Sequence, residues 1–67
     1  MIKIQLNGEI QELSKRHNID DLLKIFSIDP NKVAVELNRT VVSKDKYITT
    51  YVSNQDVVEI VTFIGGG

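Results

Sequence analysis

The sequence predicts an α+β domain in which one main helix covers one face of a mixed sheet of four to five strands. Residues 2–7 and 33–38 alternate apolar and polar side chains, the pattern of strands with one buried face. Residues 19–26 carry an apolar stripe at helical spacing, and residues 57–64 form the most hydrophobic segment. At 67 residues the chain forms one domain with a thin core.

The chain opens with a predicted β-hairpin. Ile2, Ile4 and Leu6 alternate with polar residues, and residues 9–13 return as a second strand. Asn7-Gly8 between them is a strong hairpin signal, because a type I′ turn needs positive φ at both central residues.

A polar segment from Ser14 to Asn18 predicts a loop, and Asn18 is a candidate N-cap for a helix of about ten residues. Asp20 and Asp21 suit the first turn of that helix. Its apolar stripe consists of Ile19, Leu22, Leu23 and Phe26. Asp29-Pro30-Asn31 is expected to end it, since the residue before proline disfavours helical geometry.

The second half of the chain predicts two further strands and a short irregular one. After the strand at 33–38, Asn38-Arg39-Thr40 turns the chain toward Val41-Val42, and Ser53–Asp56 forms a turn before the last strand. A right-handed crossover places that last strand beside the first, in the centre of the sheet, which is a β-grasp. Four residues in between are expected to pack at the edge of the core: Tyr47, Ile48, Tyr51 and Val52.

Composition excludes several kinds of site. The chain has no cysteine and one histidine, so it forms no disulfide and has no thiolate metal site. A net charge of −1 argues against nucleic acid as a partner, and the basic run Lys15-Arg16-His17 is interpreted as a solvated loop. No segment approaches a membrane span and the N-terminus lacks a signal-peptide pattern, so a cytoplasmic protein is expected.

The last strand has two distinct faces. Val58, Ile60 and Ile64 are expected to point to the helix, which sends the remaining side chains to the other face: Val57, Glu59, Val61 and Phe63. Periodicity alone leaves two interpretations of this second face open. Its apolar side chains are either scattered exposed residues, which are ordinary, or a contiguous docking patch for a partner.

Gly65-Gly66-Gly67 predicts a flexible tail (65–67) beyond a folded domain (1–64). Four extended residues reach about 13 Å, and side-chain-free glycines can enter a narrow channel. The reactive group delivered is the α-carboxylate of Gly67, which becomes electrophilic once converted into a mixed anhydride. Because ordering the tail costs about 1–2 kcal/mol per residue, the folded domain must dock as well. A frayed end or a cloning remnant is the alternative reading of the glycines.

These features resemble the ThiS family over the whole chain. The segments that carry the resemblance are Ile2–Glu9, Asp21-Leu22-Leu23, Val33–Asn38, Asp56–Val61 and Ile64–Gly67. The resemblance implies a ubiquitin-like β-grasp fold and a sulfur carrier of thiamin biosynthesis. It implies that an E1-like enzyme adenylates Gly67 with ATP, that a sulfurtransferase and cysteine desulfurase system converts it to a thiocarboxylate, and that thiazole synthase takes the sulfur.

Carried onto this chain, the resemblance makes Gly67 the modified residue, while Gly65 and Gly66 enter partner active sites. Partner docking is expected at Val57, Val61, Phe63 and Ile64. The chain is expected to bind no cofactor, no metal and no membrane. Three turn positions depart from the family pattern, which often has glycine there: Ser27, Arg39 and Gln55.

Because no nucleophile–base pair can be named, the chain is expected to be a protein cosubstrate and not an enzyme. The alternatives are a sulfur carrier for molybdopterin synthesis, a ubiquitin-like modifier conjugated to lysines, and a β-grasp adaptor or RNA-binding module. The last would not need a free Gly67.

Overall fold

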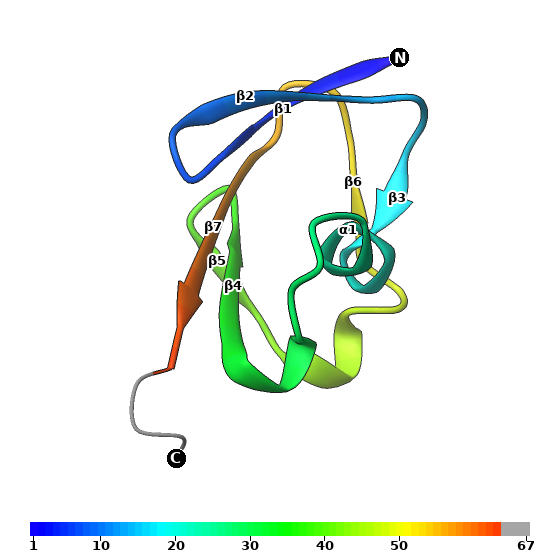
Figure 1. The fold of residues 1–67 in the computed structure, drawn as a ribbon. Coiled ribbons are helices and arrows are strands. Elements are labelled where there is room, and N and C mark those ends of the chain that lie inside the picture. Colours follow the sequence, from blue (N-terminus) through cyan, green and yellow to red (C-terminus); the bar gives the residue numbers. More distant parts are fainter. Residues whose placement is uncertain (64–67) are drawn as a thin grey trace.

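The computed structural model describes residues 1–63, which form a five-stranded mixed sheet with one helix packed on one face (Figure 1). The strand order is β2 (Glu9–Leu13), β1 (Ile2–Leu6), β7 (Val57–Thr62), β4 (Val33–Leu37) and β5 (Thr40–Val42). β1 and β7 run parallel, and the other neighbours run antiparallel. The predicted β-grasp, with the last strand beside the first, is confirmed.

Two hairpins flank the central strand β7, one on each side. In the β1–β2 turn Asn7 and Gly8 have φ of 48° and 85°, and in the β4–β5 turn Asn38 and Arg39 have φ of 51° and 70°. Positive φ at both central residues is the type I′ geometry that matches strand twist. The first turn was predicted in this form; the second has an arginine where glycine fits more easily.

The helix α1 (Ile19–Ile25) begins as predicted, because the Asn18 side-chain oxygen accepts from the Asp21 N–H at 2.7 Å. It is shorter than the expected ten residues and ends before Asp29-Pro30-Asn31. Ser27 has φ of 58°, and the Ile28 N–H donates to the Leu23 carbonyl at 2.8 Å, which is a Schellman ending. Pro30 instead begins a 3-10 turn, η1 (Pro30–Lys32).

The segment predicted as a loop contains a short strand. β3 (His17–Asn18) pairs antiparallel with β6 (Tyr51–Val52), so His17 is half-buried and lies opposite Val52. Between β5 and β6 the chain forms a second 3-10 turn, η2 (Lys44–Lys46).

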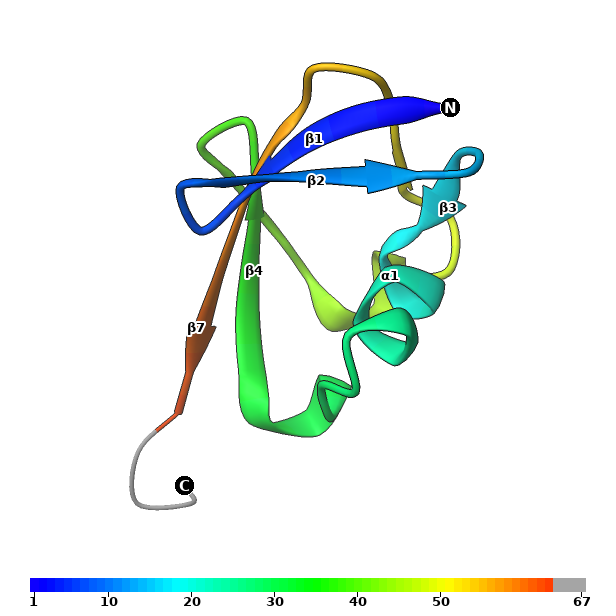
Figure 2. The same ribbon diagram turned by 45° about the horizontal axis from the view of Figure 1, so that its top comes forward.

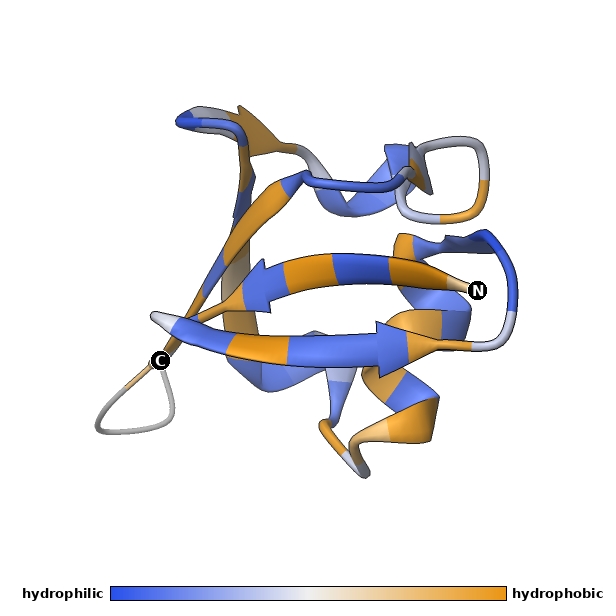
Figure 3. Ribbon diagram, turned by 90° about the horizontal axis from the view of Figure 1, so that it is seen from above, coloured by the Kyte–Doolittle hydropathy of each residue, from blue (hydrophilic) through white to orange (hydrophobic). Residues whose placement is uncertain are grey.

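The core lies between α1 and the inner face of the sheet, the face toward the helix (Figure 2). Figure 3 shows hydrophobic and hydrophilic positions alternating along β1, as a strand with one buried face requires. The buried set is Ile4, Leu6, Leu13, Ile19, Leu22, Leu23, Val33, Val35, Tyr47, Val52 and Val58. Of the four residues expected at its edge, Tyr47 and Val52 are buried; the prediction was wrong for Ile48 and Tyr51, which are exposed. None of the helical segments described is long and apolar enough to cross a membrane.

Candidate partner-docking face

The outer face of the sheet, turned away from α1, carries exposed apolar side chains around the end of β7. Val61 lies opposite Ala34 of β4 and Glu59 lies opposite Glu36, and directly opposed residues share a face. Val61 is 62% exposed and Phe63, just beyond the strand, is 55% exposed. Side chains of this size left open to solvent can be covered by a partner at no cost to the core.

The predicted division of β7 into two faces holds for the described residues. Val58 is buried and Ile60 is half-buried against the core, whereas Glu59 and Val61 are exposed. Val57 is half-buried, so it offers less surface to a partner than Val61 and Phe63. The predicted site residues Ile64, Gly65, Gly66 and Gly67 lie outside the described residues.

Two further apolar residues on the outer face were not predicted. Ile10 of β2 pairs with Gln5, which pairs with Val57, and Val41 of β5 pairs with Glu36. Both are largely exposed. The alternation of side chains along a strand could have identified both residues. Ile10 and Leu13 are three residues apart and must lie on opposite faces of the sheet, and the same holds for the neighbours Val41 and Val42.

Two carboxylates interrupt the apolar surface. Glu36 and Glu59 are directly opposite each other, both are exposed, and neither takes part in an ion pair within residues 1–63. They line a depression of about 620 Å³ together with Arg39. Like charges in opposed positions are mildly destabilising, so this arrangement does not serve the stability of the sheet.

Hydrogen bonds on both sides of β7 fix the direction of Val61 and Phe63. The Phe63 N–H donates to the Lys32 carbonyl at 2.8 Å, which continues the β4 ladder past the strand end. On the other side the Asn7 side chain bonds both backbone groups of Ile60, accepting from its N–H at 2.7 Å and donating to its carbonyl at 3.1 Å. The β7 backbone therefore leads toward the tail from a defined position.

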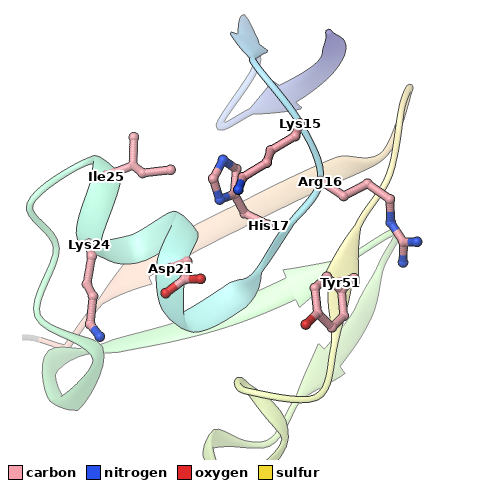
Figure 4. A pocket seen from close by; sticks show the side chains of 7 residues that line it. All are labelled: Lys15, Arg16, His17, Asp21, Lys24, Ile25 and Tyr51. Atoms are coloured by element: carbon pink, nitrogen blue, oxygen red, sulfur yellow. The ribbon is translucent and has the colours of Figure 1, made fainter.

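The basic run Lys15-Arg16-His17 lies away from this face, beside α1 and β6, where it lines a second depression of about 420 Å³ (Figure 4). The Arg16 guanidinium lies 5.1 Å from the centre of the Tyr51 ring, a cation–π contact. Lys15 and Arg16 leave the chain in different directions, so their charges do not converge on one point.

The described residues offer little acid–base or metal chemistry. No group of three or more His, Asp or Glu within residues 1–63 could hold a metal ion. Burial raises the pKa of the Tyr47 phenol above its ordinary value of 10.0, and this residue belongs to the core.

Comparison with known proteins assigns the chain to a family. A family model described as ThiS family matches residues 4–67. The sulfur carrier protein ThiS of Bacillus subtilis is 37% identical over 65 residues, covering 96% of this chain and 98% of that protein. A thiazole synthase of Paramagnetospirillum magneticum is 41% identical over 66 residues, which is 98% of this chain but 20% of that protein.

A solved structure agrees with the family match. The crystal structure of the thiamine biosynthesis protein (ThiS) from Geobacter metallireducens superposes with a TM-score of 0.87 at 29% identity, covering 98% of this chain and all of that one. The family match spans nearly the whole sequence, and the β-grasp topology accompanies it. The chain belongs to the ThiS family.

Proposed function

We propose that this chain is a sulfur carrier of thiamin biosynthesis that carries sulfur on the carboxylate of Gly67. An E1-like enzyme first joins that carboxylate to the α-phosphorus of ATP, with pyrophosphate as the leaving group. The terminal sulfur of a persulfide on a sulfurtransferase, loaded by a cysteine desulfurase, then attacks the acyl carbon and displaces AMP. A second thiol of the sulfur donor cleaves the resulting acyl disulfide, which releases the thiocarboxylate and leaves a disulfide on the donor. Thiazole synthase receives the sulfur when the C–S bond breaks, and an oxygen from water or from the acceptor substrate bonds to the acyl carbon, so that Gly67 returns to a carboxylate.

The observation that carries the proposal is the family match through residue 67, together with the exposed face beside the start of the tail. Val61 and Phe63 present apolar surface at the point where β7 leads toward Gly65 and Gly66, which would enter the partner's active site. Val57 and Ile64 complete the proposed docking set. Binding at Val61 and Phe63 would offset the entropy lost when a glycine tail is ordered.

Thiazole synthase is the best-supported partner. Relatives of that name from Paramagnetospirillum magneticum and Magnetococcus marinus contain a region 41% identical to this chain within a much longer protein. A carrier and its acceptor joined in one polypeptide would meet at high effective concentration, which supports the same pairing between separate chains.

In this role the chain is a cosubstrate and not a catalyst. ATP is bound and used by the activating enzyme, and the carrier works in the cytoplasm. The family match favours thiamin over molybdopterin synthesis and over lysine conjugation. An RNA-binding module gains no support from the outer face, which carries Glu36 and Glu59 where RNA would need positive charge. A β-grasp adaptor could use the same face but would not need a free Gly67.

Intact-mass measurement tests the proposal. The chain is incubated with ATP, the activating enzyme and a sulfur donor, and we expect the mass gain of one oxygen replaced by sulfur, located on Gly67. The matched control ends at Gly65 and keeps every described residue, so it should fold and remain unmodified. An unchanged mass of the full chain, with an activating enzyme proven active on another carrier, would rule the carrier role out.

Supplying the thiocarboxylate form to purified acceptors separates the two pathways. Thiazole synthase should consume it, and a molybdopterin synthase large subunit should not. The reverse result would reassign the pathway while keeping the carrier chemistry.

A further inference from the structure

The backbone of β7 has a free edge at Thr62. Along this strand the backbone groups of alternate residues point to the same side, and the carbonyls of Val58 and of Asp56, just before the strand, point to β1. The Gln5 N–H donates to the Asp56 carbonyl at 2.9 Å, and the Asn7 N–H donates to the Val58 carbonyl at 2.9 Å. Ile60 and Thr62 are the next two positions on that side.

At Ile60 the side chain of Asn7 replaces a neighbouring strand. β1 ends at Leu6, and the chain turns away at Asn7-Gly8, so no backbone of β1 reaches further along β7. The Asn7 amide bonds both backbone groups of Ile60, as an adjacent strand would. The Asn7 side chain therefore satisfies the backbone hydrogen-bonding groups of Ile60 on this edge of β7, but not those of any later residue.

Thr62 is the position that follows. Val61 lies opposite Ala34 in the β4 ladder, and the Phe63 N–H donates to the Lys32 carbonyl, so these alternate positions face β4. The Thr62 N–H and carbonyl therefore point the other way, and within residues 1–63 neither has a partner. In Figures 1 and 2 no element lies beside this end of β7 on the side away from β4.

The other free edges of the sheet are protected against pairing with a further strand, and this edge of β7 is not. β2 carries Glu9 and Glu12 along its outer edge, and β5 is three residues long. Charge and shortness are the usual protections against unwanted strand pairing. Residues 61–63 are uncharged, and Val61 and Phe63 are exposed.

We propose that an extended segment of thiazole synthase adds to this edge as a further strand. It pairs with the Thr62 N–H and carbonyl and covers Val61 and Phe63 on the outer face. Main-chain bonds of this kind give affinity, and alternate side chains give specificity. The identity of the partner rests on the proposed function, in which thiazole synthase accepts the sulfur; the position of the added strand rests on the hydrogen-bond pattern of β7.

A single backbone methyl group tests the added strand. The chain is short enough for chemical synthesis, and N-methylation of Thr62 removes its donor and puts bulk in the path of the added strand. The matched control is N-methylated at Glu12, whose amide points outward from the opposite edge of the sheet. Glu12 lies opposite Lys3, and the backbone groups of Lys3 bond to Asn54 and Gln55 on the other side of β1. Glu12 and Lys3 are therefore not hydrogen-bonded to each other, and the Glu12 amide is free within residues 1–63. Neither amide serves the fold, so both chains should melt like the unmodified one.

We expect N-methyl-Thr62 to weaken binding to thiazole synthase about tenfold or more, the equivalent of one lost hydrogen bond or greater, while N-methyl-Glu12 binds normally. Amide hydrogen exchange of the unmodified chain is the second measurement. The Thr62 amide should exchange quickly in the free protein and slowly in the complex.

Equal binding by all three chains, or a Thr62 amide that stays unprotected in the complex, overturns the added strand and leaves the carrier proposal standing. Failure of the unmodified chain to bind thiazole synthase overturns the proposed function instead, and with it the occupant of the edge.

Discussion

Ile4 and Ile10 belong to the same hairpin but lie on opposite faces of the sheet. Ile4 is 1% exposed in the core, and Ile10 is 65% exposed on the outer face. The same residue type therefore has two roles six positions apart: one side chain stabilises the fold, and the other is available to a partner. Hydrophobicity alone therefore does not separate core residues from exposed residues on the outer face, whereas strand register does.

The two faces also differ in their charges. The inner face and helix bury no charged or polar side chain among the described residues. The outer face places Glu36 against Glu59 between exposed apolar residues. The outer face contributes little to stability, and its Glu36–Glu59 pair is mildly unfavourable. Its composition is therefore explained better by binding than by folding.

The largest expected effect distinguishes the two isoleucines by stability. Ile4→Ala should lower the free energy of unfolding by about 2–5 kcal/mol, because it leaves a cavity in a thin core. Ile10→Ala should change it by less than about 0.5 kcal/mol. Urea denaturation measures both, and similar losses at the two positions would contradict the assignment of faces.

The next effect separates binding from stability on the outer face. Val61→Lys should weaken the complexes with the activating enzyme and thiazole synthase about tenfold or more, since it places a hydrated charge in an apolar contact. The control is Ile48→Lys, at a site 67% exposed but outside the sheet. Titration calorimetry measures affinity, and thermal melting should show both variants as stable as the parent. Equal losses of affinity for the two variants would mean that the outer face has no special part in docking.

Turn residues offer a gain in stability, and at Ser27 the change leaves both faces intact. Ser27, Arg39 and Gln55 have φ of 58°, 70° and 72°, a conformation that costs residues with a Cβ about 1–2 kcal/mol. Ser27→Gly should therefore stabilise the fold by about 0.5–1 kcal/mol after the larger entropy loss of glycine, and binding should not change. Arg39→Gly and Gln55→Gly should give similar gains. A stabilised Ser27→Gly chain that binds its partners less well would show that the two properties are coupled after all.

The smallest effect concerns the inner face at high pH. Because the pKa of Tyr47 is raised in the folded state, the folded chain holds this proton more tightly than the unfolded chain does. The resulting stability is fully present below about pH 10, the ordinary tyrosine value, and is lost as pH rises through the folded value. Tyr47→Phe should flatten that decline without altering the pH dependence near neutrality. Denaturation at a series of pH values measures this, and an unchanged alkaline decline in the variant would exclude Tyr47 as its source.

The sequence was sufficient to predict the elements with strong local signals. Asn7-Gly8, the alternation at 33–38 and the Asn18 cap each depend on neighbouring residues, and each is confirmed. The pairing of β3 with β6 could not be predicted, because strands of two residues have no period and their contact is distant in sequence. The residue pattern alone placed the helix end too late, because serine at position 27 takes the conformation that glycine normally signals; the family pattern had marked this position as a turn.

The set of apolar residues exposed on the outer face was predicted only in part, because part of it depends on pairing between distant segments. Val61 and Phe63 follow from the period of one strand, but Ile10 and Val41 join them only through the register between strands. The bond between Asn7 and Ile60 joins a turn to a strand formed much later in the chain, and no local pattern encodes it. The residues 64–67 that would carry the chemistry remain predictions of the sequence.

The central position of β7 has a consequence for how the protein is made. Both hairpins consist of neighbouring segments and can form early during synthesis, but only β7 joins them, through the pairing of Gln5 with Val57 on one side and of Val35 with Ile60 on the other. Such distant pairing slows folding, and β7 is translated after the other strands of residues 1–63. During synthesis the two hairpins therefore remain unconnected until β7 leaves the ribosome. The outer face that partners would recognise is complete only after β7 has paired with both hairpins.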